Sequence, residues 1–149
     1  MAIARGAGTE IIRSAYFEDV DSTTTTLIYG EQHHIYTILN VTIYVAARQD
    51  ATNNFQLYVQ GYDSKAGTTD QSHLLAIWTL EPNKTFVWGD KFSFNGYEPV
   101  NFTGPMDDAT KQNAIADQGS GVSQYLWCRT THADDSIELG ITYIDQNNA

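Results

Sequence analysis

Metal ligation is the first chemistry to consider, because the chain has four histidines and several paired carboxylates. His33 and His34 are adjacent, so along a strand their side chains point to opposite faces and cannot share one metal ion. His73 and His132 fall at predicted strand ends, and no Cys/His spacing typical of a zinc site is present. We therefore expect surface or loop histidines, and no metal or other cofactor.

Paired carboxylates occur at 19–21, 107–108 and 134–135, all in predicted loops. The segment 19–22 is similar to the start of a calcium-binding loop, but it lacks the glycine at the sixth position and the distal glutamate of an EF-hand. These residues are expected to be ordinary turn aspartates, and adventitious calcium in the loops is left open.

Catalytic motifs are missing from the sequence. It has no Gly-x-Ser-x-Gly elbow, His-Glu-x-x-His pair, phosphate-binding loop or Gly-x-Gly-x-x-Gly segment. A carboxylate pair for glycoside hydrolysis stays open, because the spacing that it needs is a distance in the fold. Cys128 is in register with Leu126, which indicates a buried structural thiol. We expect a protein that is not an enzyme.

Composition favours one β-rich domain. The chain has 149 residues, of which only 17% are charged, and it is rich in Thr, Asn, Gln, Tyr and Gly. Its net charge of −10 argues against nucleic acid or an anionic membrane as partner, since both require clusters of Lys and Arg. No secretory signal or membrane-spanning apolar run is present, which predicts synthesis in a cytoplasm.

Alternating apolar and polar residues predict about eight strands separated by turn signals. The expected strands are 9–17, 27–29, 35–46, 54–62, 73–80, 85–94, 122–131 and 136–144. This pattern predicts an all-β fold, an antiparallel β-sandwich or jelly roll, spanning residues 15–149 after an extended N-terminal arm of residues 1–14. The polar segment 103–121 is expected to be a long loop with a possible functional role.

The segment 34–47 is a long run of β-branched and aromatic residues. Read at period two, it places the odd-numbered residues 35–45 on the core face and the even-numbered residues 36–44 on the other face. Tyrosines therefore appear on an outer face. The same reading of the other strands gives the following expected interface residues: Tyr36, Tyr44, Tyr58, Tyr62, Tyr125 and Trp127. Two alternatives are left open, namely that the 103–121 loop covers these rings or that they are scattered singly.

The N-terminal arm is the second expected contact region, because extended arms gain affinity by ordering on contact. Its expected contact residues are Ile3, Arg5, Ile11, Ile12 and Arg13. Deleting residues 1–12 is expected to abolish binding to the partner without unfolding the domain.

The order of segments 36–46, 54–62, 74–88, 125–131 and 136–143 resembles small accessory structural proteins of tailed bacteriophages that build β-sandwich or jelly-roll domains. The resemblance covers roughly residues 34–145. It implies a virion component, namely a capsid decoration (cement) protein on the capsid surface. It further implies a homo-oligomer, with a trimer as the expected state, that contacts the major capsid protein or another virion protein.

Two other functions are kept beside this one. A tail, neck or fibre component built on the same sandwich is the first. The second is a carbohydrate-binding module, for which exposed Tyr and Trp side chains and acidic loops are the usual ingredients.

Overall fold

The computed structural model describes residues 9–99 and 121–147. These residues form nine strands and one short 3-10 turn. The strands are β1 (Thr9–Val20), β2 (Thr25–Tyr29), β3 (His34–Ala47), β4 (Asn54–Asp63), β5 (Thr68–Thr79), β6 (Thr85–Trp88), β7 (Phe92–Asn95), β8 (Tyr125–Thr130) and β9 (Ser136–Asn147), and the 3-10 turn is η1 (Ser64–Ala66).

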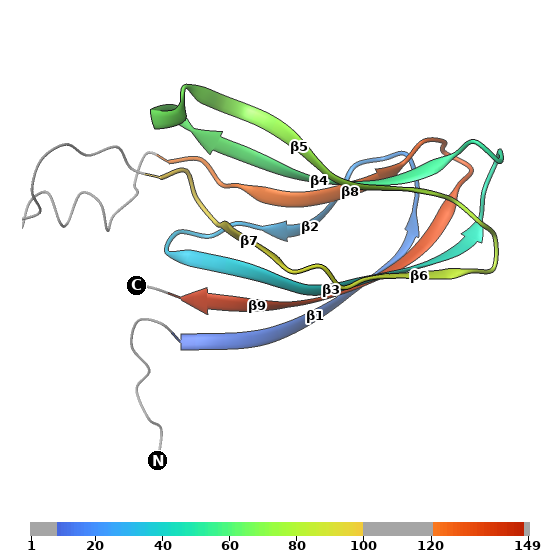
Figure 1. Cartoon of the computed structure of the whole chain (residues 1–149), viewed down its shortest axis with the longest axis horizontal. Helices are drawn as coiled ribbons and strands as arrows, with labels where there is room; N and C mark the ends of the chain where they lie inside the picture. Colours follow the sequence, from blue (N-terminus) through green and yellow to red (C-terminus); the bar gives the residue numbers. More distant parts are fainter. Residues whose placement is uncertain (1–8, 100–120, 148–149) are drawn as a thin grey trace, which may run out of the picture.

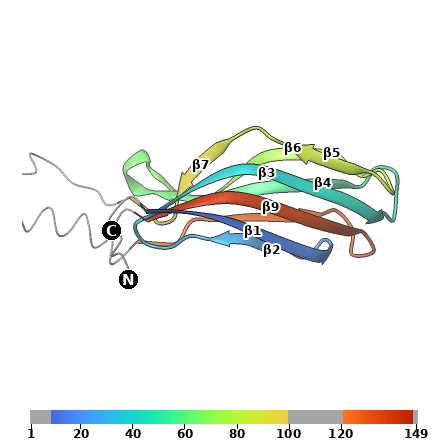
Figure 2. The same cartoon turned by 90° about the horizontal axis from the view of Figure 1, so that it is seen from below.

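The strands form two antiparallel sheets that face each other (Figure 1). Sheet A has the order β1-β9-β3-β6, with β7 also paired to β3, and sheet B has the order β2-β8-β4-β5. Figure 2 looks toward sheet A and shows β1, β9 and β3 side by side. Successive strands cross between the two sheets in the order that defines a jelly roll, with β6 and β7 together acting as one split strand. The predicted all-β sandwich is confirmed.

The core lies between the sheets and is built from one face of each strand. It contains Ile38, Val41, Phe55, Leu57, Leu80, Leu126, Cys128, Ile137 and Ile141, all nearly inaccessible to solvent. These β-branched, aliphatic and aromatic side chains suit a pleated surface covered on one side, which explains the alternating pattern of the sequence.

Strand β3 departs from the predicted alternation because it contains a β-bulge. The pairing of β3 with β9 shifts register between Ile38 and Asn40. Since a bulge inserts one extra residue, side chains on either side of it reverse parity. Tyr36 and Ile38 are therefore buried before the bulge, and Val41 is buried after it. The prediction that residue 36 points outward is wrong.

The predicted strand 85–94 is two strands. β6 pairs with the second half of β3 and β7 with its first half, so this edge of sheet A is interrupted at the level of the bulge. Phe86, Trp88, Phe92 and Phe94 nevertheless all pack against the core, as their shared parity predicts.

One end of the sandwich is joined by a close backbone crossing. The amide of Gly30 donates to the carbonyl of Gln124 (2.8 Å), and the amide of Gln124 donates to the carbonyl of Gly96 (2.9 Å). A Cβ atom at Gly30 would lie 2.0 Å from the Gly96 carbonyl oxygen. Only glycine allows three segments to approach so closely, so this residue ties β2, β7 and β8 together.

The predicted N-terminal arm overlaps strand β1. Residues 9–14 pair with β9 from Thr9↔Asn147 to Ser14↔Thr142. Residues 1–8, including Ile3 and Arg5, and nearly all of the 103–121 loop lie outside the described residues.

Candidate protein interface

The outer face of sheet A is poor in charge for a surface open to water. Its positions carry Ile12, Ser14, Tyr16, Glu138, Gly140, Thr142, Ile144, Thr37, Thr42, Tyr44, Thr85 and Val87, and Glu138 is the charged residue among these. Antiparallel sheets usually place polar and charged residues on their solvated face, whereas the cores of protein interfaces are depleted of charge. This composition is typical of a surface that another protein covers.

Three large side chains on this face are strongly exposed. Ile12 is 71% exposed, Tyr16 81% and Val87 69%. Ile12 and Tyr16 lie on β1, and Val87 lies on β6 beyond β9 and β3. The exposed apolar groups therefore span the width of the sheet.

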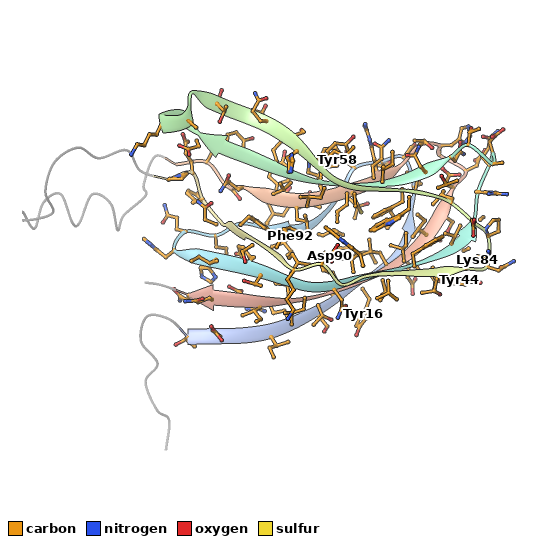
Figure 3. The ribbon with its side chains drawn as sticks, in the orientation of Figure 1. Tyr16, Tyr44, Tyr58, Lys84, Asp90 and Phe92 are labelled. Carbon is orange, nitrogen blue, oxygen red and sulfur yellow. The ribbon has the colours of Figure 1, made fainter. Side chains whose placement is uncertain are left out.

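A shallow depression of about 270 Å³ lies in the middle of the same face. Tyr16 and Tyr44, both labelled in Figure 3, line it together with Thr42 and Gly140. A Cβ atom at residue 140 would lie 2.9 Å from Thr42 Oγ1 and 3.2 Å from the ring of Tyr16. The ring of Tyr16 therefore packs over the glycine of the neighbouring strand, where a side chain would not fit.

The outer face of sheet B carries a different cluster. Tyr58 of β4 and Trp127 of β8 stack with ring centroids 4.2 Å apart, and the Arg129 guanidinium lies 5.7 Å and 5.6 Å from the two centroids. Gln56 Oε1 accepts hydrogen bonds from the Tyr58 hydroxyl (3.0 Å) and from Arg129 Nε (3.2 Å). This cluster satisfies its own polar groups and covers its own rings.

The sequence-predicted tyrosines are divided between these surfaces. Tyr44 lies on the outer face of sheet A and is 36% exposed, whereas Tyr58, Tyr62 and Tyr125 belong to sheet B. Tyr58 and Tyr62 do not share a sheet with the tyrosines of β3, because the chain crosses to the other sheet between β3 and β4.

Two predicted interface residues are buried. Tyr36 is 2% exposed and packs on Phe94, because the β3 bulge turns it into the core. Trp127 points outward but is only 8% exposed, since Tyr58 and Arg129 cover it.

Tyr62 and Tyr125 are held at the edge of the sheet B cluster. The Tyr62 hydroxyl donates to Asp70 Oδ1 (2.9 Å). Burial, the largest cause, and this hydrogen bond, the second cause, raise the pKa of Tyr62 to about 12. Tyr125 lies 5.9 Å from Tyr29, ring to ring. Tyr62 and Tyr125 therefore already contact other residues of the chain.

Three of the predicted contact residues of the arm, Ile11, Ile12 and Arg13, lie on β1, the edge strand of sheet A. Ile12 points to the outer face, whereas Ile11 and Arg13 point to the inner side. Arg13 Nε donates to Asp145 Oδ2 (2.9 Å), and this hydrogen bond raises the pKa of the guanidinium. Arg13 is thereby committed to a contact within the chain.

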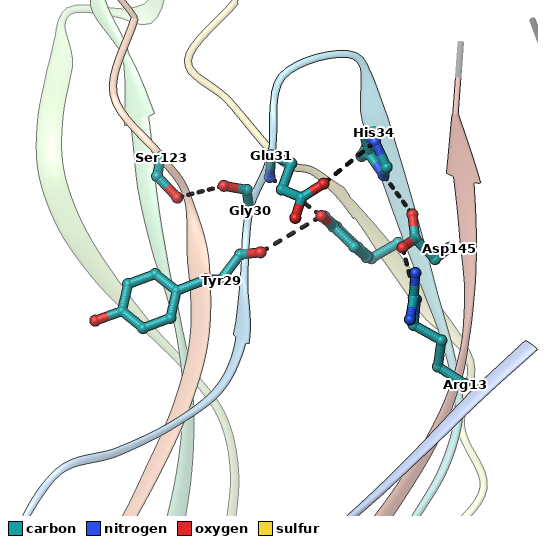
Figure 4. Close-up of polar contacts among 8 residues, drawn as sticks. Arg13, Tyr29, Gly30, Glu31, His34, Ser123 and Asp145 are labelled. Atoms are coloured by element: carbon teal, nitrogen blue, oxygen red, sulfur yellow. Dashed lines mark hydrogen bonds and ion pairs between the residues drawn. The ribbon is translucent and has the colours of Figure 1, made fainter. Parts of the chain in front are cut away.

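Asp145 lies at the centre of a polar cluster that sequence spacing did not reveal (Figure 4). Besides binding Arg13, it contacts His34 Nδ1 at 2.5 Å, and His34 Nε2 lies 3.4 Å from Glu31 Oε2. The Tyr36 hydroxyl accepts from the Glu31 amide (3.1 Å) and donates to the Tyr29 carbonyl (3.4 Å). These bonds satisfy polar groups on the inner face of sheet A. They lie at the same end of the sandwich as the Gly30 crossing and help to close it.

Metal-binding groupings are not found in residues 9–99 and 121–147: no three His, Cys, Asp or Glu side chains gather closely enough to hold an ion. Asp135, a predicted turn aspartate, accepts hydrogen bonds from the Gln49 amide, Asn53 Nδ2 and the His132 amide, and so organises two loops. Asp107 and Asp108 lie outside the described residues.

Cys128 is fully buried between the sheets, as its register predicts. Burial raises the pKa of its thiol to about 12, so the reactive thiolate is suppressed at neutral pH. Within the described segments, no helix has the length and apolar character that crossing a membrane requires.

Comparison with known proteins gives no relative in sequence: neither a family model nor a curated protein matches the chain. Among solved structures, a chain from Bacillus endospore appendages, described as disulfide-linked pili, is 9% identical with a TM-score of 0.42, over 100% of this chain and 97% of that one. A chain of the infectious bursal disease virus particle is 10% identical with a TM-score of 0.42, over 99% of this chain but only 37% of its own length. A chain of cowpea mosaic virus empty particles is 16% identical with a TM-score of 0.37, over 95% and 87% of the two chains. Likeness at this level carries no argument about function.

Proposed function

We propose that this protein is a structural virion component, a capsid decoration protein that binds neighbouring protein subunits through the outer face of sheet A. The observation that carries the proposal is the composition of that face. Its positions hold threonines, Ile12, Tyr16 and Val87, with no basic residue and with two carboxylates, Glu18 and Glu138, beside the depression. Covering such a surface with another chain lowers the free energy, because apolar groups are removed from water.

The exposed apolar side chains supply part of the free energy that specific binding requires. Burying one large apolar side chain contributes about 1.5–3 kcal/mol. Ile12, Tyr16 and Val87 are each more than two-thirds exposed in the monomer, so together they supply several such contributions. Because association also costs translational and side-chain freedom, a partner must cover the whole width of the face.

The jelly-roll fold agrees with this proposal, since double-sheet jelly rolls occur in viral capsid and lectin domains. Fold alone does not decide between those two uses. The sheet B cluster argues against a carbohydrate platform there, because Tyr58 and Trp127 stack on each other and leave no open pair of coplanar rings for a sugar.

Co-sedimentation with virus particles tests the proposal. Heads and tails are purified from a virus whose gene for this protein has been deleted. Each preparation is then mixed with the purified wild-type protein. We expect binding to heads. Binding to tails alone would replace decoration by the tail, neck or fibre alternative.

Lysine substitutions on the two sheets provide the matched comparison. The double variant Ile12→Lys/Val87→Lys places two charges on the outer face of sheet A, whereas Leu74→Lys/Ile77→Lys places two on the outer face of sheet B. Leu74 and Ile77 are 42% and 52% exposed, so both double variants are expected to fold. We expect only the sheet A variant to lose particle binding. Loss with the sheet B variant alone would refute the assignment of the face.

A further inference from the structure

The depression on sheet A has the chemistry to receive one cationic side chain. Two carboxylates, Glu18 and Glu138, line one part of it, and the tyrosines Tyr16 and Tyr44 line the rest. Both glutamates are exposed, and neither has a salt-bridge partner among the described residues. The charge of this depression is therefore negative and unbalanced.

Three cations of the described residues are engaged elsewhere. Lys84 lies beyond Tyr44 and is paired with Glu81, Nζ to Oε2, at 2.8 Å. Arg13 is bound to Asp145 on the inner side of sheet A, and Arg129 lies over the aromatic pair of sheet B. A cationic group of a bound partner would complement the charge of the depression.

The aromatic walls suit a guanidinium or ammonium group more than a metal ion. Tyrosine faces attract organic cations that lie within about 6 Å of the ring centroid. The hydroxyl of Tyr44 donates to Asn83 Oδ1 (3.2 Å), which holds that ring in place beside Thr42 and Thr85. The Tyr16 ring packs over Gly140 with one face, and at 81% exposure the rest of this side chain is open to a cation.

We infer that this depression binds an arginine or lysine side chain of the partner protein that covers sheet A, with arginine favoured. This inference rests on the proposed function and adds the chemistry of the partner. The cation lies between the two tyrosine rings and forms ion pairs with Glu18 and Glu138. Arginine is favoured because its planar group stacks on aromatic faces and donates to carboxylates at the same time.

The probe is a pair of peptides that differ only in charge: acetyl-Gly-Arg-Gly-amide and the same peptide with citrulline in place of arginine. Each is titrated into the full ¹⁵N-labelled chain while amide chemical shifts are recorded. We expect the shifts of Gly140 and Thr42 to change at least threefold more per millimolar of the arginine peptide than of the citrulline peptide. The double variant Glu18→Gln/Glu138→Gln is expected to remove that difference.

Equal responses to the two peptides, no response to either, or a difference that persists in the double glutamine variant would each overturn the inference. The proposed function fails by a separate result, namely unchanged particle binding by the Ile12→Lys/Val87→Lys variant. If that variant loses binding while the peptides act alike, the face is an interface but its partner does not place a cation in the depression.

Discussion

Replacing Tyr36 by alanine tests the bulge in β3, on which the assignment of the two faces of sheet A depends. Tyr36 is 2% exposed, and its ring lies 5.3 Å from Phe94 and 6.1 Å from Tyr143, centroid to centroid. Truncating a buried aromatic side chain to alanine costs about 3–5 kcal/mol. For a domain of this size each kcal/mol lowers Tm by about 2–4 °C, so we expect a loss of roughly 6–20 °C.

The control is Tyr16→Ala, which removes an equally large ring from the outer face of the same sheet. Tyr16 is 81% exposed, so its loss is expected to change the free energy of unfolding by no more than about 0.5 kcal/mol. Tyr36→Phe keeps the ring but loses the hydroxyl that bonds Glu31 and Tyr29, and an intermediate cost of about 1 kcal/mol is expected.

Urea denaturation followed by circular dichroism measures all three variants. If Tyr36→Ala and Tyr16→Ala destabilise the protein equally, then residue 36 does not point into the core. The reasoning from the register shift would be refuted, and with it the list of residues on the outer face.

Three other predictions concern the interior. The Cys128 thiol, with its pKa raised to about 12 by burial, should resist an aromatic disulfide reagent at pH 8 and react at once in guanidinium chloride; fast reaction of the native protein would contradict its burial. Burial raises the pKa of Tyr36 and of Tyr62, the latter to about 12, so the folded state retains phenol protons that the unfolded state releases above about pH 10. Their contribution to stability is complete below pH 10 and is lost as pH rises toward 12, which urea midpoints at pH 9, 10 and 11 should show as a steady fall. Gly30→Ala places a methyl group against the Gly96 and Gln124 carbonyl oxygens and should abolish folding or lower Tm by more than 10 °C, with Gly89→Ala, which meets open space, as the control.

Alternation in the sequence predicted the fold class because sheets with one covered face impose a period of two on their residues. It located Val41, Ile43, Val45 and Cys128 correctly on the core face. It failed at Tyr36, because a bulge is a property of pairing with a partner strand and leaves no fixed local signature.

The candidate face was only partly predictable. Tyr44 and Ile12 were identified from their types and positions, but Tyr16 and Val87 were missed, although both are strongly exposed. Within the predicted strand 9–17, alternation places Tyr16 and Phe17 on opposite faces. This alternation was the signal that could have identified Tyr16 as an outer-face residue. The depression depends on Gly140 lying beside Tyr16, a contact between residues far apart in the chain, and only the register of β1 with β9 reveals it.

Side-chain footprinting of bound and free protein tests the interface most directly, because two exposed tyrosines mark the two sheets. Tyr16 is 81% exposed on sheet A, and Tyr29 is 70% exposed on sheet B. Brief hydroxyl-radical labelling followed by mass spectrometry compares the two rings on free protein and on protein bound to virus heads. We expect Tyr16 to lose most of its labelling in the bound state while Tyr29 keeps its own. Unchanged labelling of Tyr16 on protein that sediments with heads would contradict the account.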